Sequence, residues 1–179
     1  LEDDYYGDTR FHIPFIAWYQ VMNASLALTT MEVLKDRIPV TLEQLQAGIA
    51  NTRWQGRMET ILPGVIVDGA HNEDGVRRVV ETAERFQKEY PLTLLFSAVN
   101  DKDYQDMIHT ICSRIKFRKV VTTEVGGYRE VPSAELAEIF CKEGCKDVGN
   151  SDNIEEAFHM AHEAKGEDGM LFCVGSLYL

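Results

Sequence analysis

The sequence predicts an α/β fold, with a mostly parallel, Rossmann-like sheet flanked by helices. From about Arg53 onward, short apolar runs alternate with helix-like segments, which is the rhythm of β-α-β units. The run Leu94-Leu95-Phe96 is continuously apolar, as expected for a strand that is buried on both faces. Residues 1–52 lack this alternation. We therefore expect two regions, 1–52 and 53–179.

The pattern of residues 1–52 predicts a strand-like lead-in followed by two helices. The stretch from Ile16 to about Asp36 is rich in Ala, Leu and Met and is apolar on both helical faces. A second helix is expected to start at Thr41, because Thr41-Leu42-Glu43-Gln44 has the Thr-x-x-Gln form of a capping box.

The second region predicts four strands and four helices. A helix should begin at Ser133, after Pro132, while Gly144 and Gly166 are typical helix ends. Ligands of parallel sheets bind at the carboxyl ends of the strands, so the residues after each apolar run are the candidates for a site. Strands are expected at Gly64–Val67, Leu92–Val99, Lys119–Thr123 and Met170–Val174, and helices near Asp74–Tyr90, Tyr104–Ile115, Ser133–Lys142 and Ile154–Ala164.

Composition narrows the class of protein. The net charge of −11 argues against a general nucleic-acid binder, which would need a basic stripe. The longest apolar runs fall short of the ~20 residues that a membrane helix needs, so no membrane partner is expected. The acidic opening Leu1-Glu2-Asp3-Asp4 is unlike a signal peptide. Together with four cysteines that lack a CxxC spacing, this predicts a reducing cytoplasm.

The first strand of the second region runs into Asp68-Gly69-Ala70-His71-Asn72. A glycine there permits close backbone approach, and a following helix N-terminus favours anions. Asp68 could accept hydrogen bonds from sugar hydroxyls, and His71 could donate to a phosphate or carboxylate. The structural alternative is that Asp68 caps the helix and Asn72 shapes the turn.

Arg57 follows a glycine within Trp54-Gln-Gly-Arg57-Met-Glu59. A guanidinium in such a turn suits a bidentate grip on phosphate. The alternative is a surface arginine that pairs with Glu59.

Three further candidates follow the other strands. Lys102 stands between two acids after the second strand and could be a substrate cation or a solvated loop lysine. Arg129 follows the paired glycines Gly126-Gly127, and Ser176 follows a glycine at the last strand end, where a hydroxyl and backbone N–H groups could bind a carboxylate. His159 and His162 share a helix face but lack further ligands at zinc spacing, so we predict no metal site.

These motifs, in this order, resemble folylpolyglutamate synthase and dihydrofolate synthase, members of the Mur ligase superfamily. The resemblance is carried by Trp54-Gln-Gly-Arg57-Met-Glu59, Pro63-Gly-Val-Ile-Val-Asp68-Gly-Ala-His71-Asn72, Asp101-Lys102-Asp103, Gly175-Ser176-Leu177-Tyr178 and Tyr19-Gln-Val-Met-Asn23-Ala24. It covers nearly the whole chain.

The resemblance implies an ATP- and Mg²⁺-dependent ligase that activates folate or dihydropteroate as an acyl phosphate, which the amine of L-glutamate attacks. It implies that residues 1–52 are a remnant of the central ATPase domain and that residues 53–179 are the C-terminal domain. The implied nucleotide contacts are Asn23 for adenine, Arg57 for the phosphates and Asp68 for the ribose. His71 and Lys102 are the implied catalytic residues, and Arg129 and Ser176 would contact glutamate or product.

The glycine-rich phosphate loop GxxxxGK[ST] does not occur in the sequence. The resemblance places that loop and the Mg²⁺ ligands in an N-terminal part, which would be the partner of this chain. We therefore expect an inactive fragment of a monomeric ligase. Two alternatives are a cell-wall Mur ligase, which usually carries D-Y-A-H followed by Pro, and a non-catalytic doubly wound binding module.

Overall fold

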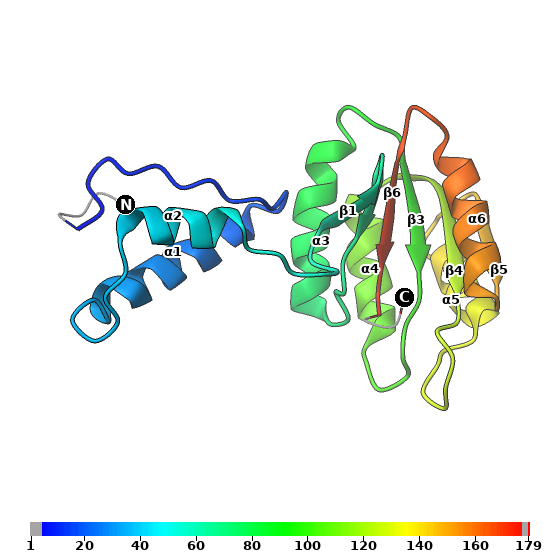
Figure 1. Ribbon diagram of the computed structural model, residues 1–179. Coiled ribbons are helices and arrows are strands. Elements are labelled where there is room, and N and C mark those ends of the chain that lie inside the picture. Colours follow the sequence, from blue (N-terminus) through cyan, green and yellow to red (C-terminus); the bar gives the residue numbers. More distant parts are fainter. Residues whose placement is uncertain (1–4, 177–178) are drawn as a thin grey trace. The chain divides into compact units, whose positions relative to one another are not determined.

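The computed structural model describes residues 5–176 and 179, which form two compact units with the division between Gln55 and Gly56 (Figure 1). The first unit contains two helices, α1 (Tyr19–Val33) and α2 (Leu42–Ala50). Within the described residues, no helix is long and apolar enough to cross a membrane.

The capping box of the first unit is confirmed. The hydroxyl of Thr41 accepts from the Gln44 backbone N–H at 3.2 Å, and the Gln44 side chain accepts from the Thr41 N–H at 2.8 Å. These two bonds satisfy N–H groups that the first turn of α2 would leave without acceptors.

The strand-like lead-in was a wrong prediction, because residues 5–18 contain turns and irregular backbone but no strand. Tyr6 explains the path of this segment. Its ring is buried with Leu28 and Leu45, and its hydroxyl donates to the Leu28 carbonyl at 2.6 Å. The apolar residues of the lead-in therefore serve a small helical core rather than a sheet.

The second unit is a six-stranded sheet in the order β1-β2-β6-β3-β4-β5, in which only β1 runs antiparallel to its neighbour. The predicted class, a mostly parallel sheet flanked by helices, is confirmed. The elements are β1 (Glu59–Leu62), β2 (Val65–Val67), α3 (Glu73–Phe86), β3 (Leu92–Phe96), α4 (Tyr104–Arg114), β4 (Phe117–Thr123), α5 (Ser133–Lys142), β5 (Val148–Ser151), α6 (Ile154–Lys165) and β6 (Met170–Val174).

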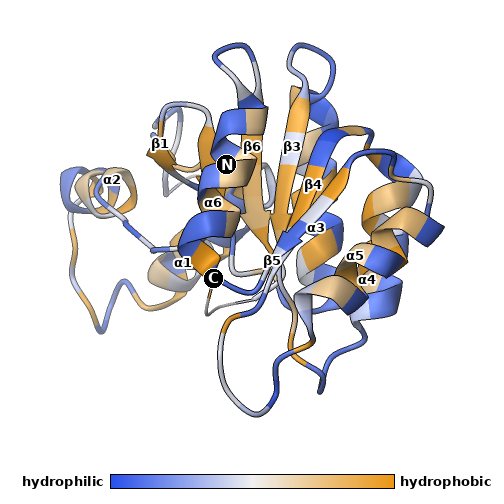
Figure 2. Cartoon of the chain, turned by 90° about the vertical axis from the view of Figure 1, so that its right-hand side faces the viewer, coloured by the Kyte–Doolittle hydropathy of each residue, from blue (hydrophilic) through white to orange (hydrophobic). Residues whose placement is uncertain are grey.

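Helices cover both faces of this sheet (Figures 1 and 2). One face packs on α6, whose small residues Ala157 and Ala161 let the helix lie close to Leu95 and Val121. The opposite face is covered by α3, α4 and α5 (Figure 2). There Phe96 meets Phe140 of α5 edge to face, with ring centroids 5.3 Å apart.

Two edge strands, β1 and β5, were not predicted. Both are short, and neither is continuously buried. β1 is joined to β2 by the turn Pro63-Gly64, in which Gly64 has φ 72°. Pro followed by a glycine of positive φ is the preferred sequence of a type II turn, so this hairpin had a signal in the sequence.

Candidate functional site

The strand ends that carry the candidate residues meet at one edge of the sheet. The Gly175 N–H donates to the Ala70 carbonyl at 3.0 Å, which joins the end of β6 to the turn after β2. The Asp68 N–H donates to the Cys173 carbonyl at 3.0 Å. The Asp68–Asn72 turn and the Gly175-Ser176 segment are therefore neighbours, as parallel strands require.

The loops after β3 and β4 form the second half of this edge. The Asn100 N–H donates to the Arg129 carbonyl at 2.7 Å, and the Val131 N–H donates to the Ala98 carbonyl at 3.2 Å. An isolated antiparallel bridge, Val99 with Glu130, lies between these bonds. The predicted strand Leu92–Val99 thus ends early, at Phe96, because its last residues pair with the neighbouring loop instead.

Asp68 is the buried centre of the β2 turn, with only 3% of its surface exposed. One carboxylate oxygen accepts from the Ala70 N–H at 2.9 Å, and the other accepts from the Met58 N–H at 2.9 Å. The alternative in which Asp68 caps the following helix is wrong, since Asn72 caps α3 by accepting from the Gly75 N–H at 2.8 Å. Asp68 instead links the turn to the loop that carries Arg57.

The Arg57 loop has an unusual backbone. Gly56 has φ 64°, and Met58, which is not glycine, has φ 48°. Left-handed geometry is costly for methionine and tends to persist only where surrounding contacts enforce it. Here the Gly56 carbonyl accepts from the Gly69 N–H at 2.7 Å, and the Met58 side chain is almost fully buried. The loop is therefore pinned on both sides of Arg57.

The Arg57 side chain itself is half-buried, and its guanidinium makes no hydrogen bond or ion pair with the residues that the structure describes. The alternative in which Glu59 pairs with Arg57 is wrong. Glu59 accepts from the Gly56 N–H at 2.9 Å and so stabilises the loop rather than the charge. The fork of N–H donors on Arg57 remains available to a ligand.

His71 is half-buried and follows Asp68 by three residues in the same turn. Its Nδ1 lies 2.8 Å from the Gly69 carbonyl oxygen. A carbonyl only accepts, so Nδ1 carries the proton and Nε2 is left to accept or, in the imidazolium, to donate. This contact orients the ring toward one tautomer, as the partner of a catalytic histidine does.

The two cationic side chains in the loops after β3 and β4 differ in whether they are paired with an acid. Lys102 is half-buried, and its ammonium has no partner among the described residues. Arg129 donates to the Asp101 carboxylate at 2.9 Å and lies over the Tyr128 ring. A ligand that binds Arg129 would have to compete with Asp101, whereas Lys102 needs no such exchange.

The Gly175-Ser176 segment is closely packed. Ser176 is 4% exposed and has an interaction partner. Gly175 has φ 109°, and a Cβ there would collide with the Ser97 carbonyl oxygen. Leu177 and Tyr178, the rest of that predicted motif, lie outside the described residues.

Asn23 belongs to the first unit. It lies on the exposed surface of α1, where its side-chain amide donates to Gln20 at 2.8 Å. Its predicted contact with adenine stays a prediction.

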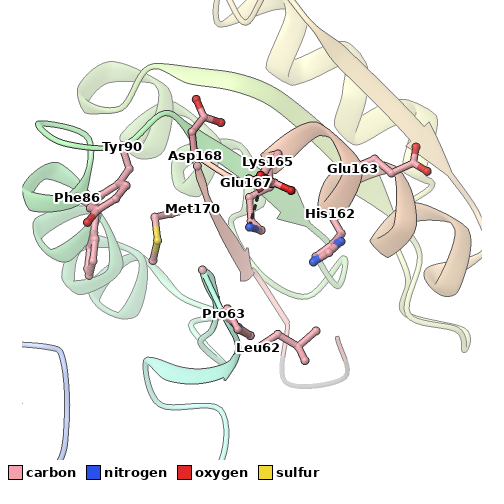
Figure 3. Close-up of a pocket in the computed structure, with 13 residues that line it drawn as sticks. Leu62, Pro63, Phe86, Tyr90, His162, Glu163, Lys165, Glu167, Asp168 and Met170 are labelled. Atoms are coloured by element: carbon pink, nitrogen blue, oxygen red, sulfur yellow. Dashed lines mark hydrogen bonds between the residues drawn. The ribbon is translucent and has the colours of Figure 1, made fainter.

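A pocket of about 880 Å³ lies at the opposite, amino-terminal edge of the sheet (Figure 3). It is lined by the β1–β2 turn, the end of α3 and the start of β6, with Phe86, Tyr90 and Met170 among its side chains. Lys165 extends into it, but its ammonium donates to the Gly166 carbonyl at 2.8 Å and so completes the C-terminal end of α6. The pocket is therefore separate from the predicted site.

Sequence reasoning named three residues of these motifs without predicting how they hold the site. The Glu59 carboxylate accepts from the Gly56 N–H, Met58 has a left-handed backbone, and Gly175 lies where a Cβ would collide. Of the three, the glycine alone had a signal in the sequence. In the described part of the chain, no group of three His, Cys, Asp or Glu side chains is placed to hold a metal ion.

Comparisons with known proteins find relatives that match nearly all of this chain. The family described as Mur ligase, glutamate ligase domain, matches residues 56–177. A dihydrofolate synthase/folylpolyglutamate synthase of Bacillus subtilis is 30% identical over 99% of this chain. The chain spans 40% of that relative's length.

Among solved structures, folylpolyglutamate synthase of Mycobacterium tuberculosis complexed with ADP superposes with a TM-score of 0.80 at 26% identity, covering 97% of this chain and 40% of that one. A more distant match is UDP-N-acetylmuramoyl-L-alanyl-D-glutamate–2,6-diaminopimelate ligase of Synechococcus, which is 29% identical over 66% of this chain and 25% of its own length.

Proposed function

Because this chain belongs to the Mur ligase family through its glutamate ligase domain, we propose that it is the C-terminal part of an ATP-dependent ligase that adds L-glutamate to folate or to dihydropteroate. The relative from Bacillus subtilis carries both activities in its name. Homologues named in this way are ligases, and one solved relative was crystallised with ADP.

The observation that best supports this proposal is the position of Arg57. A guanidinium that has no partner among the described residues, on a loop pinned by the Gly56 and Met58 backbone, loses little freedom when it binds an anion. Phosphoryl transfer needs positive charge in place before the transition state forms. We therefore assign Arg57 to the phosphates of ATP.

The proposed reaction has two steps. A carboxylate oxygen of the pterin substrate attacks the γ-phosphorus of ATP, and ADP leaves with the electrons of the broken P–O bond. The glutamate amine then attacks the acyl carbon, and inorganic phosphate leaves. Nε2 of neutral His71 accepts the proton that the amine gives up, because Nδ1 is occupied by the Gly69 carbonyl. Lys102 stabilises the developing negative charge.

We assign Asp68 a positioning role, since its two oxygens hold the Ala70 and Met58 N–H groups and it is almost fully buried. The ribose contact that the resemblance implies for Asp68 stays a prediction. So do the glutamate contacts of Arg129 and Ser176, with Arg129 disfavoured by its ion pair with Asp101.

The described residues bring no group of three metal-ligating side chains together that could hold Mg²⁺ without the phosphates of a nucleotide. We therefore expect the Mg²⁺ of ATP to be held elsewhere in a longer ligase.

A surface for the remainder of such a ligase is present on α1. Trp18, Met22 and Leu26 follow each other at a spacing of four residues and are 67–69% exposed. Large apolar side chains in one helical stripe are typical of an interface. We propose that this stripe packs against the remainder of the phosphate-binding domain, to which residues 1–52 would belong in the full-length protein.

The test is a ligase assay on the full-length protein with ATP, glutamate, and either dihydropteroate or tetrahydrofolate. We expect ADP formation that depends on one or both pterins, and no ATP hydrolysis by the 179-residue chain alone. The match to the Synechococcus ligase is the reason to test a cell-wall substrate as well. Turnover of a UDP-muramoyl peptide without turnover of either pterin would favour the cell-wall alternative.

A further inference from the structure

Two thiols of the second unit approach each other near the C-terminal ends of α4 and α5. Cys112 lies in the last turn of α4, and Cys145 follows α5 after the turn at Gly144. Their sulfur atoms are 3.6 Å apart, and both side chains are half-buried. Solvent can reach this pair, unlike the buried Cys173.

The surrounding structure holds the two thiols in place. Nδ1 of His109, one turn before Cys112, lies 2.9 Å from the Glu143 carboxylate. At the other end of the helices, the Tyr104 hydroxyl donates to Glu135 at 2.7 Å. The two contacts tie α4 to α5, which lie side by side in Figure 2.

The backbone on the Cys145 side is equally defined. Gly144 has φ 94°, a left-handed conformation that closes α5, and the Cys145 N–H donates to the Phe140 carbonyl at 3.0 Å. Cys145 therefore emerges from a fixed turn rather than from a free loop.

We propose that Cys112 and Cys145 are a thiol-oxidation site and form a reversible intrachain disulfide. A disulfide bond is about 2.0 Å long, so the two sulfur atoms must approach from 3.6 Å. The proposal does not depend on the ligase function, so either can fail alone.

The reaction needs an oxidant, for which a small disulfide such as oxidised glutathione suffices. The thiolate of Cys145 attacks one sulfur of that disulfide and expels one glutathione thiolate, leaving a mixed disulfide. The Cys112 thiol gives up its proton, attacks the sulfur of Cys145 and expels the second glutathione thiolate. Two protein thiols lose two electrons in total, and two glutathione molecules take up those electrons and the two protons.

The order of attack follows from the contact between the thiols. Either sulfur can be the donor in this contact. With Cys112 as the donor, the hydrogen bond lowers the pKa of Cys145 and raises the pKa of Cys112, while the nearby Glu143 carboxylate raises both. Cys145 is therefore the first nucleophile and Cys112 the resolving thiol.

The experiment uses the Cys141→Ser variant, because Cys141 is the exposed thiol four residues before Cys145 and would otherwise react alone. The reduced variant is incubated with oxidised glutathione, quenched in acid, and its free thiols are counted after unfolding. We expect three thiols to fall to one, and digestion followed by mass spectrometry to find the Cys112 and Cys145 peptides linked. Dithiothreitol should restore all three.

Cys112→Ser and Cys145→Ser, each in that background, are the matched controls. Each should lose the intrachain link, and Cys112→Ser should retain bound glutathione on Cys145. The proposal is overturned if three thiols persist under conditions that oxidise a model dithiol peptide. It is equally overturned if the linked peptides pair Cys173 with either partner, or if the link survives in either control.

Discussion

Replacing Asp68 by asparagine should loosen the Arg57 loop and destabilise the second unit. The carboxylate accepts two backbone N–H groups, from Ala70 and Met58, at 2.9 Å each. An asparagine keeps one acceptor oxygen but turns an NH₂ donor toward the other N–H. Hydrogen bonds to a charged group contribute about 1.5–3 kcal/mol, and a buried donor without an acceptor costs about 1–3 kcal/mol.

We therefore expect Asp68→Asn to lower the free energy of unfolding by about 2–4 kcal/mol. With a urea m-value of roughly 2 kcal/mol/M, the midpoint should fall by about 1–2 M. Circular dichroism should follow the transition, because both tryptophans, Trp18 and Trp54, lie in the first unit. Amide hydrogen exchange at Met58 should accelerate in the variant.

Asp74→Asn is the matched control, since Asp74 is an exposed carboxylate in the first turn of α3. Its loss should cost less than about 1 kcal/mol through the helix dipole alone. A midpoint for Asp68→Asn within roughly 0.3 M of the Asp74→Asn value, with Met58 exchange unchanged, would refute the positioning role of Asp68.

Three further substitutions test the packing of this edge by urea unfolding. Gly175→Ala should cost about 2–4 kcal/mol, because its Cβ meets the Ser97 carbonyl and its φ of 109° disfavours a side chain; a loss below about 1 kcal/mol would contradict that geometry. Asn72→Ala should cost about 1 kcal/mol by removing the cap of α3, with faster exchange of the Gly75 amide. Ser97→Ala should leave stability unchanged or raise it by up to about 1 kcal/mol, since the Ser97 hydroxyl is buried without an acceptor among the described atoms.

The central strands were predictable because a strand that is buried on both faces consists of a continuous run of apolar residues. β3 is buried at every residue, and β6 at all but its first. The meeting of the candidate residues at one edge then followed from the parallel arrangement of the strands. The edge strand β5 carried no such signal, because Val148–Ser151 includes a glycine and two polar residues and is only partly buried.

The sequence did not show which of the candidate arginines forms an ion pair with a neighbouring acid. Arg57 and Arg129 look alike in sequence, since each follows a glycine-containing turn near an acid. Whether the acid reaches the guanidinium depends on backbone geometry, which turns Glu59 toward the Gly56 N–H and Asp101 toward Arg129. The left-handed Met58 has no sequence signature, because methionine rarely adopts that conformation.

Replacing Arg57 by alanine in the full-length ligase tests the central claim, that this residue supplies charge to phosphoryl transfer from ATP. The control is Arg77→Ala, which removes an exposed arginine of α3 that pairs with Glu73 at 3.4 Å. We expect kcat to fall about 10³-fold for Arg57→Ala, with Arg57→Lys intermediate and Arg77→Ala near the parent. A kcat for Arg57→Ala within about threefold of the Arg77→Ala value would contradict the account.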